Sequence, residues 1–257
     1  MKIYENSGVI GCHELSEGIY ELIIKSGAAK QAVPGQFMML YPGDSATILP
    51  RPISICEIDR EAETLRLVYR VAGAGTKEFS GLKAGNSLRV LGPLGNGFPM
   101  EKAESKAAVL IGGGIGVPPI LELSREIRAK EVNTLVGYRN NKMFLKEDFE
   151  KYSSTHIATE DGSFGTKGNV LDIMREKSIP CDVIYACGPM PMLRAIKKYA
   201  EERNIPAYIS LEERMACGVG ACLGCVCKTV SKDAHSHVNN ARVCTEGPVF
   251  LASEVEI

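Results

Sequence analysis

Five of the nine cysteines in this 257-residue chain lie in one short stretch, at positions 217, 222, 225, 227 and 244. An even distribution would place about one cysteine there, so the clustering needs a chemical reason. Cys217, Cys222, Cys225 and Cys244 have the spacing C-x4-C-x2-C…C, which is the plant-type ligand pattern of a [2Fe–2S] cluster. The sequence therefore predicts that these four thiolates hold such a cluster.

The residues between the ligands fit a loop wrapped around an inorganic core. Backbone N–H groups must turn toward the cluster sulfurs, and Gly218, Gly220 and Gly224 can adopt the φ values that this requires at low cost. We expect Cys244 to supply the fourth ligand from a separate strand or turn. Cys227 lies two residues past the third ligand and would point to the opposite side of an extended segment, so we assign it to packing.

Other chemistry fits the same cysteines less well. Structural zinc sites usually show paired C-x2-C or C-x2–4-C arms, which this spacing does not reproduce. Disulfides need an oxidising compartment. A Rieske centre needs two His ligands, whereas His235 and His237 lie in the stretch before the fourth Cys and are expected to be solvated loop residues. We expect Cys12, Cys56 and Cys181 to be structural.

Composition limits the classes of protein that can carry this site. Hydrophobic residues make up 45% of the chain and charged residues 24%, which is typical of globular proteins. The net charge of -1 lacks the positive field that nucleic-acid or anionic-membrane binding usually requires. The first residues carry no basic stretch followed by an apolar core, and no apolar run approaches about 18 residues. We therefore expect a cytoplasmic protein that binds neither nucleic acid nor membranes.

The first hundred residues have the pattern of strands and turns. Residues 64–71 alternate between apolar and polar side chains, the period-two pattern of a half-buried strand. We expect a small antiparallel barrel or sandwich at residues 1–103. Similar short apolar runs, separated by Gly, Pro, Asn and Asp, lie at 19–24, 36–41, 52–58 and 88–91.

From residue 107 the pattern changes to alternating strands and helices. An apolar run, a glycine turn and a helical stretch from Val117 to Lys130 open a βαβ unit. The alternation predicts an open parallel sheet over residues 104–211. Residues 212–257 are rich in Cys and Gly, and we expect a third, small module held by its cofactor. The further strands are expected near 132–138, 155–159, 182–187 and 207–211, and the helices near 169–177 and 191–203.

Two glycine turns in this sheet predict a nucleotide site. Gly112, Gly113, Gly114 and Gly116 follow a strand and lead to a helix N-terminus, where free N–H groups and the helix dipole favour phosphate. Taken alone, such a glycine turn can be only a tight turn that binds no nucleotide. A second turn, Cys187-Gly188-Pro189, ends a later strand, at the edge where doubly wound sheets bind ligands.

The number of electrons that each site handles predicts a flavin between them. A nicotinamide delivers two electrons as hydride, a [2Fe–2S] cluster accepts one at a time, and flavin can do either. Arg51-Pro52-Ile53-Ser54 offers a cation for the pyrophosphate and a hydroxyl for the ring edge. Gly73-Ala74-Gly75-Thr76 offers backbone N–H groups and a further hydroxyl.

These segments resemble the ferredoxin–NADP reductase superfamily. Its flavin barrel carries an Arg-Pro-x-Ser segment like residues 51–54, and its nucleotide domain carries a Cys-Gly-Pro segment like residues 187–189. The tail narrows the resemblance. Residues 210–227 and 242–250 look like the electron-transfer subunits of NAD-linked, two-subunit dihydroorotate dehydrogenases.

The resemblance implies FAD, a [2Fe–2S] cluster and NAD as cofactors. FAD would be held by Arg51–Ser54, by the strand residues Val68, Tyr69 and Arg70, and by Gly75-Thr76. In such enzymes a separate FMN-containing catalytic subunit oxidises dihydroorotate to orotate in pyrimidine biosynthesis. Electrons run from FMN through the cluster and FAD to NAD+, and two copies of each subunit form a heterotetramer. No residue set in this chain is suited to removing a proton from the dihydropyrimidine, so we assign no catalytic residue.

Three questions stay open at this point. A flavin and iron–sulfur subunit of a ferredoxin- or sulfide-linked NAD(P)H oxidoreductase would share the same modules, although Glu212-Glu-Arg-Met before the first ligand favours the dihydroorotate family. A redox sensor would not need the nucleotide turns. The residues do not decide between NAD and NADP, because the strand ending at Gly137-Tyr138-Arg139 carries no Asp or Glu for a ribose hydroxyl, and Arg139 could suit the 2′-phosphate of NADP. NAD is implied by the family alone.

Overall fold

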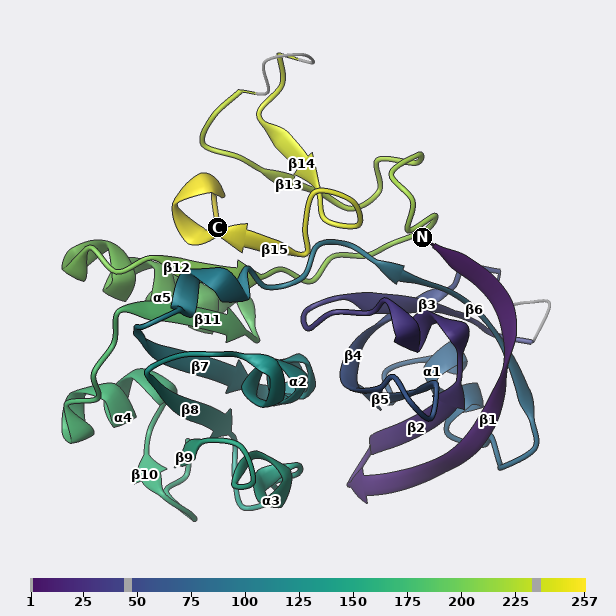
Figure 1. Cartoon of the computed structure of the whole chain (residues 1–257), viewed down its shortest axis with the longest axis horizontal. Helices are drawn as coiled ribbons and strands as arrows, with labels where there is room; N and C mark the ends of the chain where they lie inside the picture. Colours follow the sequence, from purple (N-terminus) through teal and green to yellow (C-terminus); the bar gives the residue numbers. More distant parts are fainter. Residues whose placement is uncertain (1, 44–47, 233–236) are drawn as a thin grey trace.

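The structure is a computed structural model that describes residues 2–43, 48–232 and 237–257. The N-terminal part forms a barrel, the middle forms an α/β domain, and the C-terminal segment lies across one end of both (Figure 1). None of the helices in these ranges is long and apolar enough to cross a membrane.

The N-terminal strands close into an antiparallel barrel in the order β1-β2-β5-β4-β3-β6, which confirms the predicted barrel. The alternation in β5 directs Leu65, Leu67 and Tyr69 into its core, as predicted. The bounds are β1 (Ile3–Ser16), β2 (Ile19–Lys25), β3 (Phe37–Tyr41), β4 (Arg51–Asp59), β5 (Thr64–Arg70), β6 (Ser87–Leu94) and the short helix α1 (Ala74–Phe79).

Strand β1 has no counterpart in the sequence-based prediction. Its consecutive inward positions are Ser7, Val9 and Gly11, all buried. Two of these three side chains are small or polar, so the apolar alternation that marks the other strands is missing.

The α/β domain is a mainly parallel sheet in the order β10-β9-β8-β7-β11-β12-β15. From β7 the chain continues to β8 on one side and later to β11 on the other, so the direction of winding reverses between β7 and β11. The bounds are β7 (Ala107–Gly113), α2 (Pro118–Glu126), β8 (Glu131–Tyr138), α3 (Lys146–Phe149), β9 (Ser154–Thr159), β10 (Thr166–Lys167), α4 (Val170–Lys177), β11 (Val183–Cys187), α5 (Met190–Arg203) and β12 (Ala207–Ser210).

Helix α2 is shorter than the predicted stretch to Lys130. Ile127 turns to extended dihedrals (φ -64°, ψ 135°), and its side chain is buried. The N–H of Lys130 donates to Lys106 O at 2.9 Å, so the chain has already turned back toward the sheet. The helical pattern in the sequence continues past the true end of α2, because apolar periodicity does not show where the chain turns back.

The C-terminal segment contains two short strands and one strand that joins the α/β sheet. β13 (Val226–Lys228) pairs with β14 (Asn240–Arg242), and β15 (Val249–Leu251) runs antiparallel to β12. The sheet expected from residues 104–211 therefore takes one edge strand from residues 212–257.

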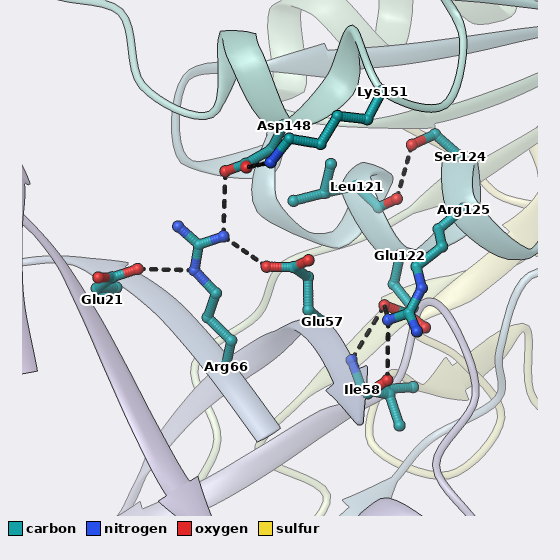
Figure 2. A network of polar contacts seen from close by, with 10 residues as sticks. All are labelled: Glu21, Glu57, Ile58, Arg66, Leu121, Glu122, Ser124, Arg125, Asp148 and Lys151. Atoms are coloured by element: carbon teal, nitrogen blue, oxygen red, sulfur yellow. Dashed lines mark hydrogen bonds and ion pairs between the residues drawn. The ribbon is translucent and has the colours of Figure 1, made fainter. Parts of the chain in front are cut away.

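An ion-pair network joins the barrel to the α/β domain (Figure 2). Arg66 on β5 donates from Nε to Glu21 at 2.7 Å and from Nη1 to Glu57. The same Nη1 lies 3.1 Å from Asp148 on α3, so one guanidinium connects two barrel carboxylates with one from the other domain. Because the Arg66 side chain is only 18% exposed, solvent screens these pairs less than it screens surface pairs.

A second contact between the domains buries a carboxyl group. Glu122 on α2 is fully buried, and its Oε2 accepts the N–H of Ile58 on β4 at 3.0 Å. Arg125 donates to Ile58 O at 3.0 Å, and its Nη1 lies 3.5 Å from Glu122 Oε2 (Figure 2). Burial, together with the neighbouring Glu126 carboxylate, raises the pKa of Glu122 to about 8.

We predict that Glu122→Gln reduces the pH dependence of stability. The folded pKa lies above the ordinary value of about 4.3, so the folded state keeps a proton that the unfolded state has released. The contribution of Glu122 to stability is therefore full below about pH 4.3 and is lost as pH rises through about 8. Gln cannot ionise and still accepts from Ile58, so the variant should melt above wild type at pH 8.5 and close to it at pH 5.

The matched control is Glu61→Gln, which makes the same charge change at an exposed position. Thermal melts monitored by circular dichroism at both pH values compare the three proteins. A Glu122→Gln variant that melts further below wild type at pH 8.5 than at pH 5 would contradict the prediction.

Candidate functional site

Strand β4 changes neighbours along its length, so the ladder between β4 and β5 is open at one end, and this end is called the opening below. Residues 51–54 pair with β3, from Leu40↔Arg51 to Phe37↔Ser54. The ladder between β4 and β5 begins only at Ile55↔Leu67 and continues to the other end of the strands. The segments 51–54 and 68–70, both predicted to hold FAD, therefore flank the same opening, each with one backbone edge outside that ladder.

The third predicted flavin segment lies beside the first. A Cβ placed on Gly75 would be 3.0 Å from Nε and 3.2 Å from Cζ of Arg51, so the guanidinium crosses the backbone at the start of α1. Arg51 also donates to Leu49 O at 2.6 Å. Two motifs that are 24 residues apart in sequence thus share one site, where a cation and backbone N–H groups lie close together.

The hydroxyl of Thr76 has a different task from the one predicted. Its Oγ1 accepts the N–H groups of Ala72 and Gly73 at 2.9 and 3.1 Å and donates to Gly73 O. The hydroxyl holds the turn before α1, so what this turn offers a ligand is backbone. The sequence could not reveal this because a Thr three residues after the start of a turn suits either role.

The side chains of β5 are mostly committed to packing. Tyr69 is buried in the barrel, and its hydroxyl lies 3.8 Å from Cys12 Sγ. Val68 is buried on the opposite face, in the core shared with α2. Arg70 is exposed. Val68 and Tyr69 can therefore reach a flavin only through their backbone.

The two glycine turns predicted to bind a nucleotide meet at the carboxyl edge of the sheet. Strands β7 and β11 end side by side, with Cys187 opposite Gly112. A Cβ on Gly116 would overlap the Cys187 carbonyl, and a Cβ on Gly188 would lie 3.2 Å from Gly113 Cα. The close approach of these turns to each other explains the glycines at 113, 116 and 188.

Gly114 is the member of the turn that faces open space. It has a positive φ of 54°, and a Cβ built on it would meet no atom within 4 Å among the described residues other than its chain neighbours. The turn lies where the sheet reverses its winding, which is where such sheets bind ligands. Gly114 is therefore the position at which a phosphate can approach the backbone.

The four predicted cluster ligands form two thiol pairs. The Cys222 thiol is the cysteine neighbour that helps to lower the pKa of Cys217, and the Cys225 thiol is the cysteine neighbour that, after burial, raises the pKa of Cys244. In the parts of the chain that the structure describes, no three His, Cys, Asp or Glu side chains group as they would around a single metal ion. Two pairs of thiols suit a core with two irons, each taking two sulfurs, better than a zinc site, where four ligands surround one ion.

Backbone amides surround these thiols as a cluster site requires. The N–H of Val219 donates to Cys217 Sγ and that of Gly224 to Cys222 Sγ, both at 3.4 Å. Burial raises the pKa of Cys217, but hydrogen bonds from backbone N–H groups and from Cys222 outweigh it and lower the pKa to about 6. The loop thus stabilises a thiolate, which is the form that binds metal.

One predicted backbone role is wrong. Gly218 and Gly220 have positive φ values of 68° and 87°, as expected, but Gly224 does not. The third left-handed residue is Leu223, with φ 56°. In the turn between the second and third cysteines, the strained backbone conformation therefore lies one residue earlier than predicted. The Leu223 side chain is apolar and 60% exposed to solvent.

Cys12, Cys56, Cys181 and Cys227 lie outside these pairs. Cys227 packs against the core, where burial raises its pKa, and Cys56 is fully buried. Cys12 and Cys181 are partly buried. His237 is exposed, and His235 lies outside the described residues.

The cluster loop rests directly on the barrel. A Cβ on Gly218 would be 2.8 Å from Met39 Cγ and 3.1 Å from Leu94 Cδ1. Met39 on β3 is paired with Pro52 on β4, within the first predicted flavin segment. Met39 and Leu94 were not predicted from the sequence, since no motif marks a contact that arises only when the tail folds over the barrel.

Two carboxylates near the nucleotide edge were also missed. Glu160 and Asp161 follow β9, and their N–H groups donate to Tyr138 O and Arg139 O at the end of β8. The expected signal, an acid at the end of the second strand, is absent from this chain. The neighbouring strand brings acidic residues to the same edge instead.

The barrel, its opening and the adjoining switch point define a flavin reductase fold of the ferredoxin–NADP reductase type. A solved NADH-dependent reduced ferredoxin-NADP oxidoreductase is similar over 97% of this chain and 89% of that one, with TM-score 0.85 and 26% identity. A ferredoxin NADP+ reductase from Neisseria gonorrhoeae shares the fold, with TM-score 0.64 over 77% of this chain and 91% of that one at 15% identity.

Sequence comparisons identify the family. Residues 212–256 match the iron-sulfur cluster binding domain of dihydroorotate dehydrogenase B, and residues 110–198 match the oxidoreductase NAD-binding domain. Electron transfer subunits of dihydroorotate dehydrogenase B (NAD(+)) from Listeria innocua and Bacillus velezensis are 46% and 42% identical, over 97% and 95% of both chains. The chain belongs to the family of dihydroorotate dehydrogenase B (NAD(+)) electron transfer subunits.

Alanine at two glycines of the first turn should separate packing from ligand approach. Gly116→Ala forces a Cβ into the Cys187 carbonyl and should lower stability by about 1–3 kcal/mol or more. Gly114→Ala meets open space and should cost only about 1–2 kcal/mol for its left-handed φ. The second variant should nevertheless bind NADH about tenfold more weakly, because its methyl group occupies the exposed approach.

Thermal melts and NADH titrations of both purified variants check this. Unchanged NADH affinity in Gly114→Ala would contradict the role given to Gly114. A melting temperature of Gly116→Ala above that of Gly114→Ala would contradict the packing argument.

Proposed function

We propose that this chain passes electrons from an FMN-containing dihydroorotate dehydrogenase subunit to NAD+, through a [2Fe–2S] cluster and FAD. The observation that carries the proposal is that the cluster loop adjoins the proposed flavin site. Gly218 of the cluster loop touches Met39, and Met39 is paired with Pro52 at the barrel opening. Electron transfer weakens steeply with distance, and here one strand separates the two sites.

FAD is proposed to occupy the opening between β4 and β5. Arg51 is suited to neutralise the pyrophosphate, and Gly75 allows the guanidinium to lie across the α1 backbone. The free edges of residues 51–54 and 68–70 offer N–H and C=O groups to a planar heterocycle. Bound FAD supplies the exchange between one-electron and two-electron transfer.

NAD is proposed to bind across the ends of β7 and β11. Gly114 leaves the backbone open to phosphate, and Cys187-Gly188-Pro189 closes the other side of the switch point. Glu160 and Asp161 lie beside the end of β8. Their negative charge disfavours the additional phosphate of NADP at that edge.

The cluster is proposed to take Cys217 and Cys222 on one iron and Cys225 and Cys244 on the other. This assignment follows the two thiol pairs. Amides from Val219 and other loop residues then surround the sulfurs, which stabilises negative charge on the cluster.

The catalytic partner subunit is proposed to dock over the cluster loop. Cys222 is exposed, and the apolar side chains of Val219, Leu223 and Val226 are exposed around it. Apolar side chains gathered on a surface are typical of protein interfaces. A partner bound there covers this patch and brings its flavin close to the cluster, in an assembly with two copies of each subunit.

The alternative, a subunit of a ferredoxin- or sulfide-linked NAD(P)H oxidoreductase, is less well supported. The solved ferredoxin-linked oxidoreductase is 26% identical to this chain, whereas the dihydroorotate dehydrogenase subunits exceed 40% over nearly the whole length. The match at residues 212–256 is to the same family.

Serine in place of each cysteine tests the ligand assignment. Substitution at Cys217, Cys222, Cys225 or Cys244 should abolish iron–sulfur absorption, because a hydroxyl replaces a soft thiolate poorly. Cys227→Ser is the matched control and should keep nearly all its iron, since this thiol packs against the core. Iron and sulfide analysis of anaerobically purified protein decides. Full iron in any of the four, with loss in Cys227→Ser, would overturn the assignment.

The division of labour between subunits is tested by activity. The isolated chain should oxidise NADH with an artificial dye and show no activity with dihydroorotate. Adding the FMN-bearing subunit should produce dihydroorotate-dependent NAD+ reduction, and Cys217→Ser should fail in that assay with its FAD site filled. Dihydroorotate oxidation by this chain alone would contradict the proposal.

A further inference from the structure

Two buried side-chain oxygens within the described ranges have no hydrogen-bond partner: Oε1 of Glu122 and Oγ1 of Thr245. The carboxyl of Glu122 is largely protonated at neutral pH and lies beside Glu126. This environment accounts for the unpaired Oε1 of Glu122. No described residue accounts for the unpaired hydroxyl of Thr245. Buried hydroxyl groups are paired in most folded proteins because an unpaired one is costly, so an acceptor outside the chain is indicated.

Thr245 lies against the loop that carries the cluster ligands. It directly follows Cys244, and its N–H donates to Arg242 O at 3.1 Å. A Cβ on Gly220 would be 3.3 Å from Thr245 Oγ1 and 3.0 Å from Cγ2. The Gly220 backbone is also a neighbour of Cys244 and lowers the pKa of that thiol. The Thr245 hydroxyl thus packs on a loop residue that lies near a ligand sulfur.

A nearby cavity does not satisfy this hydroxyl. Thr245 and Cys244 line a cavity of about 380 Å³ together with polar residues that include Gln36 and Asn96. Thr245 Oγ1 itself is buried and not exposed to that space. The side of the hydroxyl for which a contact is known is the cysteine loop, where it packs against Gly220.

We propose that the Thr245 hydroxyl donates a hydrogen bond to a sulfur atom of the [2Fe–2S] cluster and so raises its reduction potential. Reduction adds negative charge to the cluster, and a donor aimed at its sulfurs stabilises the reduced form. Thr245 holds no iron and tunes the site through this bond. The inference rests on the proposed cluster function.

Two substitutions separate the hydroxyl from the shape of the side chain. Thr245→Val keeps the branched shape that packs on Gly220 and removes the donor. Thr245→Ser keeps the donor and removes the methyl group. A packing role predicts that serine disturbs the site at least as much as valine, whereas a hydrogen bond predicts the reverse.

The test is a redox titration of the full chain, purified anaerobically and followed by the electron paramagnetic resonance signal of the reduced cluster. At the wild-type midpoint potential, Thr245→Val should shift the oxidised-to-reduced ratio about three- to tenfold toward the oxidised form, the size expected of one hydrogen bond. Thr245→Ser should titrate like wild type, and iron content and the flavin midpoint should not change in either variant.

The outcomes separate this inference from the proposed function. An unchanged midpoint in a fully loaded Thr245→Val overturns the inference alone, as does a shift in Thr245→Ser as large as in Thr245→Val. Absence of a [2Fe–2S] signal in the wild type overturns the proposed function. Where the valine variant does not assemble the cluster, Thr245→Ala is titrated in its place. If the valine, alanine and serine variants all fail to assemble the cluster, Thr245 has a packing role, and the inference is overturned.

Discussion

Strand β4 pairs with β3 at one end and with β5 at the other, and the remaining parts of the molecule are arranged around this division. The first half flanks the opening in the barrel wall. The second half receives helix α2, whose Glu122 accepts the Ile58 N–H, while the cluster loop rests on β3 through Met39. Strand β4 thus contacts the proposed flavin site, the nucleotide domain and β3, the strand on which the cluster loop rests. A shift in its register would move all three, because a slip of one residue exchanges the two faces of a strand.

The contacts that hold α2 in place differ in kind at its two ends. Near its start, the glycine turns pack backbone against backbone, and no side chain can be added at Gly116 without displacing Cys187. Near its end, polar groups hold α2 to β4, and Arg66 on the neighbouring strand reaches Asp148 on α3. Removing one partner of this half-buried ion pair would leave the remaining charges without compensation. The nucleotide edge is therefore held in place by close packing on one side and by paired charges on the other.

The sequence was most informative where chemistry demands particular residues at fixed spacing. The cysteine spacing and the glycine turns marked residues that the fold brings together, and short apolar runs located most strands of the barrel and sheet. It failed where tertiary context decides: β1 has small inward residues, Leu223 carries the strain expected at Gly224, and the Thr76 hydroxyl closes its own turn. The contact between Gly218 and Met39 depends on how the tail crosses the barrel, which no local pattern encodes. The cofactor contacts of individual residues stay predictions.

Strand β15 has a consequence for how such a protein can be divided or recombined. The cysteine loop leaves the α/β domain after β12 and returns to it, so the last strand closes the edge beside Ser210 and Tyr208. A cut at residue 212 would leave β12 as an open edge, with unpaired backbone groups ready to bind other chains. A chimera that exchanges the iron–sulfur segment must therefore also match β15 to the recipient sheet. The iron–sulfur segment leaves the sheet after β12 and returns to it, and its strand β15 forms the edge of the α/β domain.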